Sequence, residues 1–368
     1  MTRHDFIRGH HWIDPGNDPK EPRLLFAKEM VEMFQDGQSV DFSSGKPFAI
    51  ADEDPFSTTE GALLVFQTGG SSGKPAQVIH SADNLLHAVA GLQTRIGFGP
   101  ISSVCCLPLY HLGGWMQVHR AIQTSGSVFF CSYQELAVDT FARKLEGRWL
   151  SLVPTQLYKL VKSTQALANL RKARGIFVGG AAISPRLSAL CRQEELPVWP
   201  TYGMTETAGM VTLLSSEEFL DGREGVGQIL PHSELSLGGK DGKIRIKCKS
   251  LCLAKPPRRF HPGEWLQTED YGEFNDEGYW TVSGRGDRLI VSGGENLDPT
   301  IAERAIMGTG LVEECVVVGI KDERWGQLAR AYLTPSCTNL VEVQKLAKRL
   351  LPGANYPKEW IATDELPL

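Results

Sequence analysis

Between residues 62 and 213, short apolar runs alternate with segments of helical periodicity, and this alternation limits the possible folds more than any other feature. The run ALLVF precedes a glycine-rich loop and then SADNLLHAVAGLQTRIG, a helical pattern that Ser81 can cap. The runs WLSLVP and GIFVGGAAI are also followed by helical patterns. Strands that alternate with helices are typical of an α/β architecture with a largely parallel sheet, which we therefore expect here.

A different pattern begins after Leu213. The segments SELSLGG, GKIRIKC, GEWLQTEDYGEF and GYWTVSGR predict a small antiparallel β subdomain. After Arg285, the segments VEECVVVGI and NLVEVQKLAKRLL predict a small α+β domain. We place the joint near residues 286–288. This gives an N-terminal domain over residues 1–286 and a C-terminal domain over residues 287–368.

Charge and cysteine usage narrow the classes of partner. A net charge of −5 shows none of the basic excess of nucleic-acid-binding proteins. We interpret the one basic cluster, KPPRRFHPGEW from Lys255, as a solvated surface turn. The eight cysteines lack zinc-site spacing, and most lie in apolar runs, so we expect reduced core thiols in a cytoplasmic protein. No segment reaches about 18 consecutive apolar residues, so no membrane span is expected.

Three motifs carry the chemistry. The first, QTGGSSGKPAQ, follows the run ALLVF and combines glycines with hydroxyls, which suits a nest of backbone N–H groups around phosphate. A solvent loop is the alternative, because the motif is not that of an NTPase P-loop. In the second, TYGMTETAGM, Glu206 can offer Mg²⁺ an oxygen and Tyr202 can lie against a base. An ordinary turn in which Glu206 caps a helix remains open. In the third, Asp270 and Arg285 flank a hairpin and can hold a ribose diol from two sides.

In this order, the three motifs resemble those of the adenylate-forming superfamily, which contains acyl- and aryl-CoA ligases, peptide-synthetase adenylation domains and luciferases. The first is similar to T-S-G-[ST]-T-G-x-P-K-G, and YGMTET is similar to Y-G-x-T-E. GRGDRLIVSGGENLDPTIAE looks like G-R-x-D-D-x-I-x-x-G-G-E-N-I-x-P-x-E-I-E. Within the superfamily, LPLYHLGGWMQVHRAI and GIFVGGAAISPRL look most like segments of the o-succinylbenzoate–CoA ligases of menaquinone and phylloquinone synthesis.

The resemblance implies a two-step reaction with ATP, Mg²⁺ and CoA. A carboxylate attacks the α-phosphate of Mg·ATP to give an acyl-adenylate and pyrophosphate, and the thiol of CoA then displaces AMP. The resemblance also implies residues that hold the β- and γ-phosphates: Thr68, Gly69, Gly70, Ser71, Ser72, Gly73 and Lys74. Thr205 and Glu206 would serve the α-phosphate and Mg²⁺, and Asp270 and Arg285 the ribose. The residues implied around adenine are Gly179, Gly180, Ala181, Tyr202 and Gly203.

The resemblance further implies residues for the acid, the thiol and the domain motion. His111 would be a gate near the carboxylate and the thiol, with Gly203 beside the acid. Arg120 would meet a second carboxylate of the substrate, although a surface charge on a helix is an equal alternative. Asp287 matches the hinge of the small domain. The glycines of SGGEN, Gly293 and Gly294, would help to form the thiol channel.

Two departures from the family pattern qualify these expectations. Ala76 stands where the phosphate loop of the family has a lysine, so Lys74 or backbone amides would have to supply the positive potential. The sequence ends at YPKEWIATDELPL, before the family's Gly-Lys segment, so either the chain is a fragment or it adenylates poorly. We expect an extension that carries the Gly-Lys segment to raise ATP–pyrophosphate exchange. Another aryl or fatty acid as substrate, or a non-catalytic nucleotide-binding role, stays open. So does the choice between a monomer and a homodimer.

Overall fold

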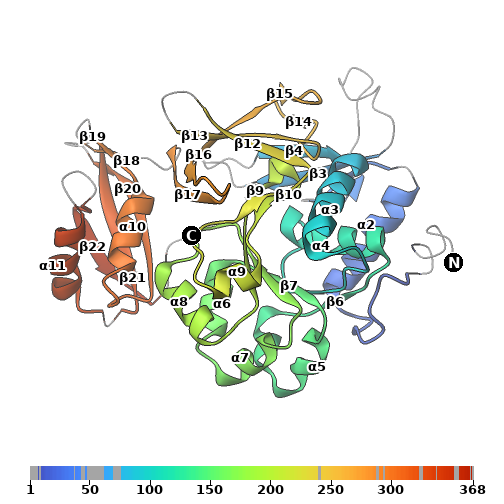
Figure 1. Cartoon of the computed structure of the whole chain (residues 1–368), viewed down its shortest axis with the longest axis horizontal. Helices are drawn as coiled ribbons and strands as arrows, with labels where there is room; N and C mark the ends of the chain where they lie inside the picture. Colours follow the sequence, from blue (N-terminus) through green and yellow to red (C-terminus); the bar gives the residue numbers. More distant parts are fainter. Residues whose placement is uncertain are drawn as a thin grey trace.

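The computed structural model describes most of the chain. The described residues are 7, 10–36, 38–42, 46–47, 62–68, 76–238, 242–286, 290–292, 295–322, 326–336, 338–351, 356–364 and 366. Three sheets and their helices form the N-terminal part, and a separate layer of strands and two helices forms the C-terminal part (Figure 1).

A seven-stranded sheet runs through the described residues of the N-terminal part, in the order β11-β10-β9-β8-β7-β5-β6. All pairs among β5 to β9 are parallel. The strand β10 pairs antiparallel with β9, and β11 pairs antiparallel with β10. Its strands are β5 (Ser103–Cys105), β6 (Val128–Phe130), β7 (Trp149–Leu152), β8 (Gly175–Val178), β9 (Val198–Met204), β10 (Gly209–Leu213) and β11 (Gln228–Ile229). The expected α/β architecture with a largely parallel sheet is therefore confirmed.

The helices of this part follow the predicted periodicity. Ser81 caps α3 with a capping box, as its position before the helical pattern predicts. The helix α4 is buried along nearly its whole length, including the polar side chains of Gln117, His119 and Arg120. The helices are α2 (Pro22–Gln35), α3 (Ala82–Ile96), α4 (Leu112–Thr124), α5 (Ala142–Leu145), α6 (Pro154–Leu160), α7 (Thr164–Leu170), α8 (Pro185–Gln193) and α9 (Ser216–Leu220).

A second sheet brings together segments from both ends of the N-terminal part, in the order β15-β14-β4-β3-β1-β2. The strands β3 and β4 form an antiparallel pair in which Thr68 lies opposite Ala76, so the glycine-rich loop joins two paired strands. The late strand β14 pairs with β4 through Ala254 and Ile79. The strands are β1 (Val40–Asp41), β2 (Lys46–Pro47), β3 (Leu63–Thr68), β4 (Ala76–Ser81), β14 (Ala254–Lys255) and β15 (Arg258–Arg259).

The antiparallel subdomain expected after Leu213 is present as the sheet β12-β13-β16-β17. Alternate residues of β13 are buried, as in a sheet with one face on a core. Buried Trp280 lies in the core cluster on that face. The strands are β12 (Ser233–Gly238), β13 (Lys243–Cys248), β16 (Leu266–Phe274) and β17 (Trp280–Arg285).

The C-terminal unit, by which we mean the described residues from Ile290 onward, has its own sheet and its own core. Its strands are β18 (Ile290–Ser292), β19 (Glu295–Leu297), β20 (Glu314–Asp322), β21 (Gly326–Thr334) and β22 (Glu359–Ala362), and its helices are α10 (Pro299–Met307) and α11 (Leu340–Leu350). Its buried cluster includes Val317, Leu333 and Val343. These features confirm the α+β pattern predicted for this region.

A small set of contacts connects the C-terminal unit with α6 and α8. Arg186 of α8 donates to the carbonyl oxygens of Gly310 at 3.2 Å and Val312 at 3.1 Å. Lys162 forms an ion pair with Glu313. We call these contacts the α8 clasp. Both members of the ion pair are substantially exposed, so the pair itself contributes little stability.

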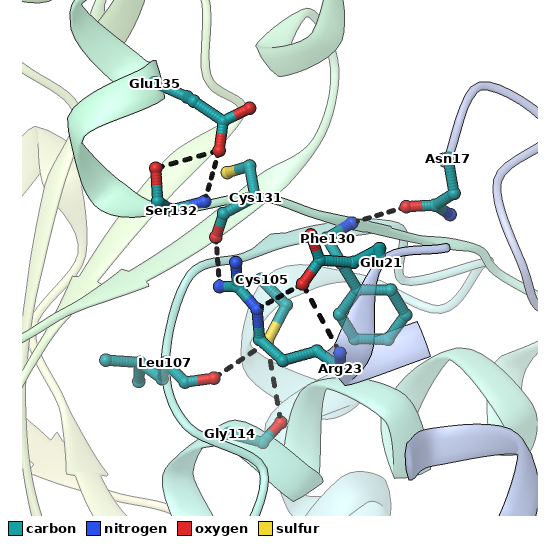
Figure 2. Close-up of polar contacts among 10 residues, drawn as sticks. All are labelled: Asn17, Glu21, Arg23, Cys105, Leu107, Gly114, Phe130, Cys131, Ser132 and Glu135. Carbon is teal, nitrogen blue, oxygen red and sulfur yellow. Dashed lines mark hydrogen bonds and ion pairs between the residues drawn. The ribbon is translucent and has the colours of Figure 1, made fainter. Parts of the chain in front are cut away.

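The N-terminal segment is anchored to the edge strand of the central sheet (Figure 2). Arg23 of α2 donates from Nη1 to the carbonyl of Cys131, and its Nε donates to Glu21 Oε1 at 2.7 Å. The side chain of Asn17 accepts a hydrogen bond of 2.7 Å from the backbone N–H of Phe130. The N-terminal segment is therefore packed against the central sheet.

All seven cysteines in the described part of the chain carry free thiols, and six of them are buried, as expected. Burial raises the pKa of Cys191 to about 12 and that of Cys248 to about 11, so both thiols stay protonated at neutral pH. In the same part of the chain, no helix is both long and apolar enough to cross a membrane.

Candidate active site

Tyr202, Asp270 and Arg285 meet at the junction of the central sheet and the antiparallel subdomain. The hydroxyl of Tyr202, in β9, donates to Asp270 Oδ2 at 2.7 Å. Asp270 and Arg285 are direct cross-strand partners in β16 and β17, with 3.5 Å between Arg285 Nε and Asp270 Oδ1. Burial, followed by the charge of Asp270, raises the pKa of Tyr202, so the hydroxyl remains a donor. A carboxylate in this setting can accept two hydrogen bonds from a diol.

The prediction that Asp270 and Arg285 flank a hairpin is confirmed, but their arrangement differs from the one expected. They lie side by side on adjacent strands rather than on two sides of a ligand, because the β16–β17 register pairs them directly. Tyr202 joins this pair of residues through the hydrogen bond from its hydroxyl to Asp270. The sequence did not indicate that contact.

Thr205 and Glu206 form a 3₁₀ turn between β9 and β10, and other segments hold this turn through its backbone. His80 Nε2 lies 2.7 Å from the carbonyl oxygen of Thr205, and the backbone N–H of Cys252 donates to the carbonyl of Glu206 at 2.7 Å. Ser250 Oγ donates to the carbonyl of Thr207 at 2.7 Å. All three contacts are made to backbone carbonyl oxygens of the turn, so the carboxylate of Glu206 takes no part in them.

The carboxylate of Glu206 pairs with Lys255 instead of capping a helix. Lys255 Nζ lies 2.7 Å from Glu206 Oε1, and only 11% of the Glu206 side chain is exposed. The interpretation of the basic cluster as a solvated turn is thus wrong for Lys255, because β14 runs beside β4 and directs this lysine to the site. It holds for Arg258 and Arg259, which are exposed.

Glycines at two strand ends permit close approach of backbone and side chains. A Cβ on Gly179, just after β8, would lie 2.3 Å from Thr201 Oγ1. A Cβ on Gly203 would lie 2.0 Å from the carbonyl oxygen of Gly209. Gly180 has a φ of +82°, which favours glycine. With exposed Ala181, these residues lie at the carboxyl end of the sheet, where ligands bind in α/β folds.

Arg120 is buried, so the interpretation of this residue as a surface charge is wrong. Its side chain is 95% buried in α4, and its Cζ lies 5.6 Å from the ring centroid of Phe177. Its Nε has no hydrogen-bond partner among the described residues, which also offer it no ion pair. Burial lowers the pKa of Arg120 to about 10, so the guanidinium is still charged at neutral pH.

His111 is the N-cap residue of α4. It is exposed, and its ring lies 4.5 Å from that of Tyr110, centroid to centroid. Partial burial lowers its pKa, which favours the neutral imidazole. It shares no described hydrogen bond with Glu206 or Asp270.

Several expected residues fall outside the described part of the chain. Thr68 and Ala76 mark the two ends of the phosphate loop, and Thr68 Oγ1 donates to the carbonyl of Ala76 at 3.4 Å. The expected residues that the structure does not describe are Gly69, Gly70, Ser71, Ser72, Gly73, Lys74, Asp287, Gly293 and Gly294.

Sequence reasoning missed His80 and Lys255. The period-2 pattern of β4 could have indicated that His80 shares a face with the loop end, since Ala76, Val78 and His80 alternate along one strand. Burial lowers the pKa of His80 to about 4, so its neutral imidazole donates to the carbonyl of Thr205. No local signal pointed to Lys255.

Two protein-family models match this chain. The model of the AMP-binding enzyme family matches residues 15–247, and the model of the AMP-binding enzyme C-terminal domain matches residues 302–368. The chain belongs to the AMP-binding enzyme family. Both matches lie on the units seen in the structure, because the first spans the central sheet and the second spans most of the C-terminal unit.

Individual relatives of this AMP-binding enzyme agree with the family. The chain is 28% identical over 356 residues to the 2-succinylbenzoate–CoA ligase of Bacillus cytotoxicus, with 90% of this chain and 73% of the relative covered. The o-succinylbenzoate CoA synthetase of Bacillus subtilis, solved with the acyl-adenylate intermediate, is 26% identical with a TM-score of 0.70, over 83% of this chain and 66% of that one.

Similarity in fold extends to a different activity. The amide bond synthetase of Marinactinospora thermotolerans has a TM-score of 0.70 at 21% identity, over 83% of this chain and 66% of that chain. The chain spans about two-thirds of the length of several relatives that it matches. The fold is therefore that of the family, and the acid has to be argued from side chains of this chain.

Proposed function

We propose that the chain is an o-succinylbenzoate–CoA ligase that uses ATP, Mg²⁺ and CoA. In the first step, a carboxylate oxygen of the acid attacks the α-phosphate of Mg·ATP, and pyrophosphate leaves. In the second step, the sulfur of CoA attacks the acyl carbon and AMP leaves. The named relatives support this assignment, since both act on the same acid.

Buried Arg120 is the observation that carries the choice of acid. A buried guanidinium whose Nε has no hydrogen-bond partner among the described residues is costly, so its presence favours an anionic ligand that completes it. Phe177 lies two residues before Gly179 on β8, which places the ring below Arg120 about 7 Å along the strand from the open sheet end. An acid with a second carboxylate at that depth would meet Arg120 while its reacting carboxylate stays at the strand ends.

The remaining residues suit Mg·ATP. Asp270, Tyr202 and Arg285 offer acceptor and donor atoms to a ribose, and the segment from Gly179 to Ala181, just after β8, would lie against a base. Glu206 offers one carboxylate, and Mg²⁺ that arrives on ATP needs only one or two from the protein. Within the described part of the chain, no three His, Cys, Asp or Glu side chains form a metal site.

The same proposal assigns roles to residues whose function rests on family resemblance. Residues 1–286 would hold both substrates, and residues 287–368 would rotate about Asp287 between the two steps. The phosphate loop from Thr68 to Lys74 would hold the β- and γ-phosphates. His111 would gate the thiol, and Gly293 and Gly294 would form part of its channel.

Pyrophosphate release tests the acid assignment. The chain is assayed with Mg·ATP and o-succinylbenzoate, benzoate or octanoate, each in turn. We expect release with o-succinylbenzoate at a kcat/KM at least about 100-fold above benzoate, because benzoate leaves Arg120 unpaired. Mass spectrometry of the CoA thioester checks the second step.

Other outcomes would select other functions. Preference for benzoate or octanoate would identify a ligase for another aryl or fatty acid. Silence with every acid, together with retained ATP binding, would identify a non-catalytic nucleotide-binding protein.

A further inference from the structure

Glu206 and Lys255 form the one ion pair of the described site that involves the Mg²⁺-binding candidate. Their atoms Oε1 and Nζ are 2.7 Å apart, and the carboxylate is nearly buried while 41% of the lysine side chain stays exposed. A nearly buried carboxylate without a cation would repel the triphosphate of ATP. The pair is thus more than a surface contact, since it sets the charge that an incoming nucleotide meets.

The strand register explains how Lys255 reaches the site. Ala254 of β14 lies opposite Ile79 of β4 in an antiparallel pair, so Lys255 falls opposite Val78. Side chains alternate along a strand, and therefore Lys255 shares a face with Ala76, Val78 and His80. His80 shows where this face points, because its Nε2 contacts the carbonyl of Thr205, next to Glu206.

Ala76 on this face is the position at which the similar family motif carries a lysine. Lysine side chains from positions 76 and 255 would start from neighbouring strands, one diagonal step apart, on the same face of the same sheet. We propose that Lys255 supplies the positive charge that the family motif places at position 76, where this chain has alanine. It acts as a positioning residue that holds Glu206 and offsets its charge beside the triphosphate. This inference rests on the proposed use of Mg·ATP.

Equilibrium binding of Mg·ATP and of adenosine, without any acid, tests the assignment on the whole chain. We expect Lys255→Met to weaken Mg·ATP binding about tenfold or more, as for the loss of one charge-assisted contact. Adenosine binding should not change, because adenosine carries no phosphate. Moving the charge, in the double variant Ala76→Lys with Lys255→Met, should bring Mg·ATP affinity back to within about threefold of the unaltered chain.

Lys247→Met is the matched control. It removes a strand lysine from an ion pair of 2.8 Å with Glu234, away from Glu206. It should leave both affinities unchanged. Thermal unfolding of each variant shows that the fold is intact.

Two results would overturn the inference. One is unchanged Mg·ATP affinity in Lys255→Met. The other is parallel weakening of Mg·ATP and adenosine that the double variant does not relieve, as expected if the pair only stabilises the turn. Because the readout needs no acid, loss of Mg·ATP affinity in a chain that is silent with o-succinylbenzoate would refute the proposed acid and leave this inference standing.

Discussion

Arg120 is the buried residue at which recognition of the acid can be tested apart from stability. Its guanidinium lies on Phe177, and no described residue pairs with its Nε. We expect Arg120→Met to lower kcat/KM for o-succinylbenzoate about 100-fold while a monocarboxylic acid such as benzoate loses less than about threefold. The free energy of unfolding should not fall, since methionine fills the volume without a buried charge.

The control for this variant is Arg174→Met, which removes an exposed arginine stacked 5.3 Å from the neighbouring ring of Trp149. It should leave the preference between the two acids unchanged. Equal losses for both acids in Arg120→Met would contradict an interaction with a second carboxylate.

His232 makes stability depend on pH. Burial, followed by the charge of nearby His87, lowers its pKa to about 4, and neither ring nitrogen has a hydrogen-bond partner among the described residues. Between pH 6.5 and 4, His232 binds a proton in the unfolded chain but stays neutral in the folded chain. The free energy of unfolding therefore falls as pH falls. Above pH 6.5, the contribution of His232 to the free energy of unfolding is fully present.

Substitution His232→Leu should therefore flatten the acid side of the stability profile. We expect the slope between pH 6 and 4.5 to decrease by up to about 1.4 kcal/mol per pH unit, the value for one proton. Urea unfolding at several pH values measures it. Replacing exposed His261 by Leu is the control, and an equal slope in all three proteins would refute the assignment.

At the level of single residues, the sequence was informative where the contact is local. Asp270 and Arg285 flank one hairpin, so their proximity could be predicted from the turn between them. The contact from Lys255 to Glu206 spans 49 residues, and that from His80 to Thr205 spans 125. Such contacts depend on strand register and burial, which a motif does not encode. For the same reason, the burial of Arg120 could not be predicted from the sequence.

At the level of elements, the hairpin of β9 and β10 has little room at Gly203. A Cβ there would lie 2.0 Å from the Gly209 carbonyl oxygen, so the strands would have to separate. We expect Gly203→Ala to cost about 2 kcal/mol or more of stability and to abolish Mg·ATP binding, because the strand leads into the Thr205–Glu206 turn. Chemical unfolding and calorimetric titration measure the two effects.

Gly99→Ala is the matched control, since nothing lies within 4 Å of a Cβ at Gly99. It should be close to neutral in both measurements. A Gly203→Ala protein with normal Mg·ATP affinity would show that the hairpin tolerates the added methyl group.

Among the elements, the parallel strands were the most predictable part of the fold. Their apolar runs alternate with helical segments, and each strand pairs with a neighbour across one crossover. The sheet that joins β14 to β4 was not predictable, because β14 has only two residues and its partner lies far back in the chain. Short edge strands carry too little periodicity to reveal their partners.

On the scale of the whole molecule, the α8 clasp helps to hold the C-terminal unit, together with the hydrogen bond of 2.8 Å from Arg304 of α10 to the carbonyl oxygen of Val282. Arg186 supplies two hydrogen bonds to backbone carbonyls of that unit. We expect Arg186→Ala to cost about 1 kcal/mol of this contact and to speed hydrogen exchange of residues 308–313 about fivefold. Exchange within the core of either unit should not change.

Arg171→Ala serves as the control, because Arg171 pairs with Glu194 inside the N-terminal part at 2.5 Å. Raised salt should loosen the clasp further through the exposed pair of Lys162 and Glu313. Exchange at residues 308–313 that ignores both the variant and salt would mean that other contacts hold the unit.

The separate core of the C-terminal unit has a consequence for how the protein melts. Its buried residues from Ile290 to Leu351 form one cluster around their own sheet, distinct from the clusters of the N-terminal part. Units with separate hydrophobic cores unfold as distinct cooperative blocks. A calorimetric scan should therefore contain two overlapping endotherms, and no single melting temperature will describe this chain.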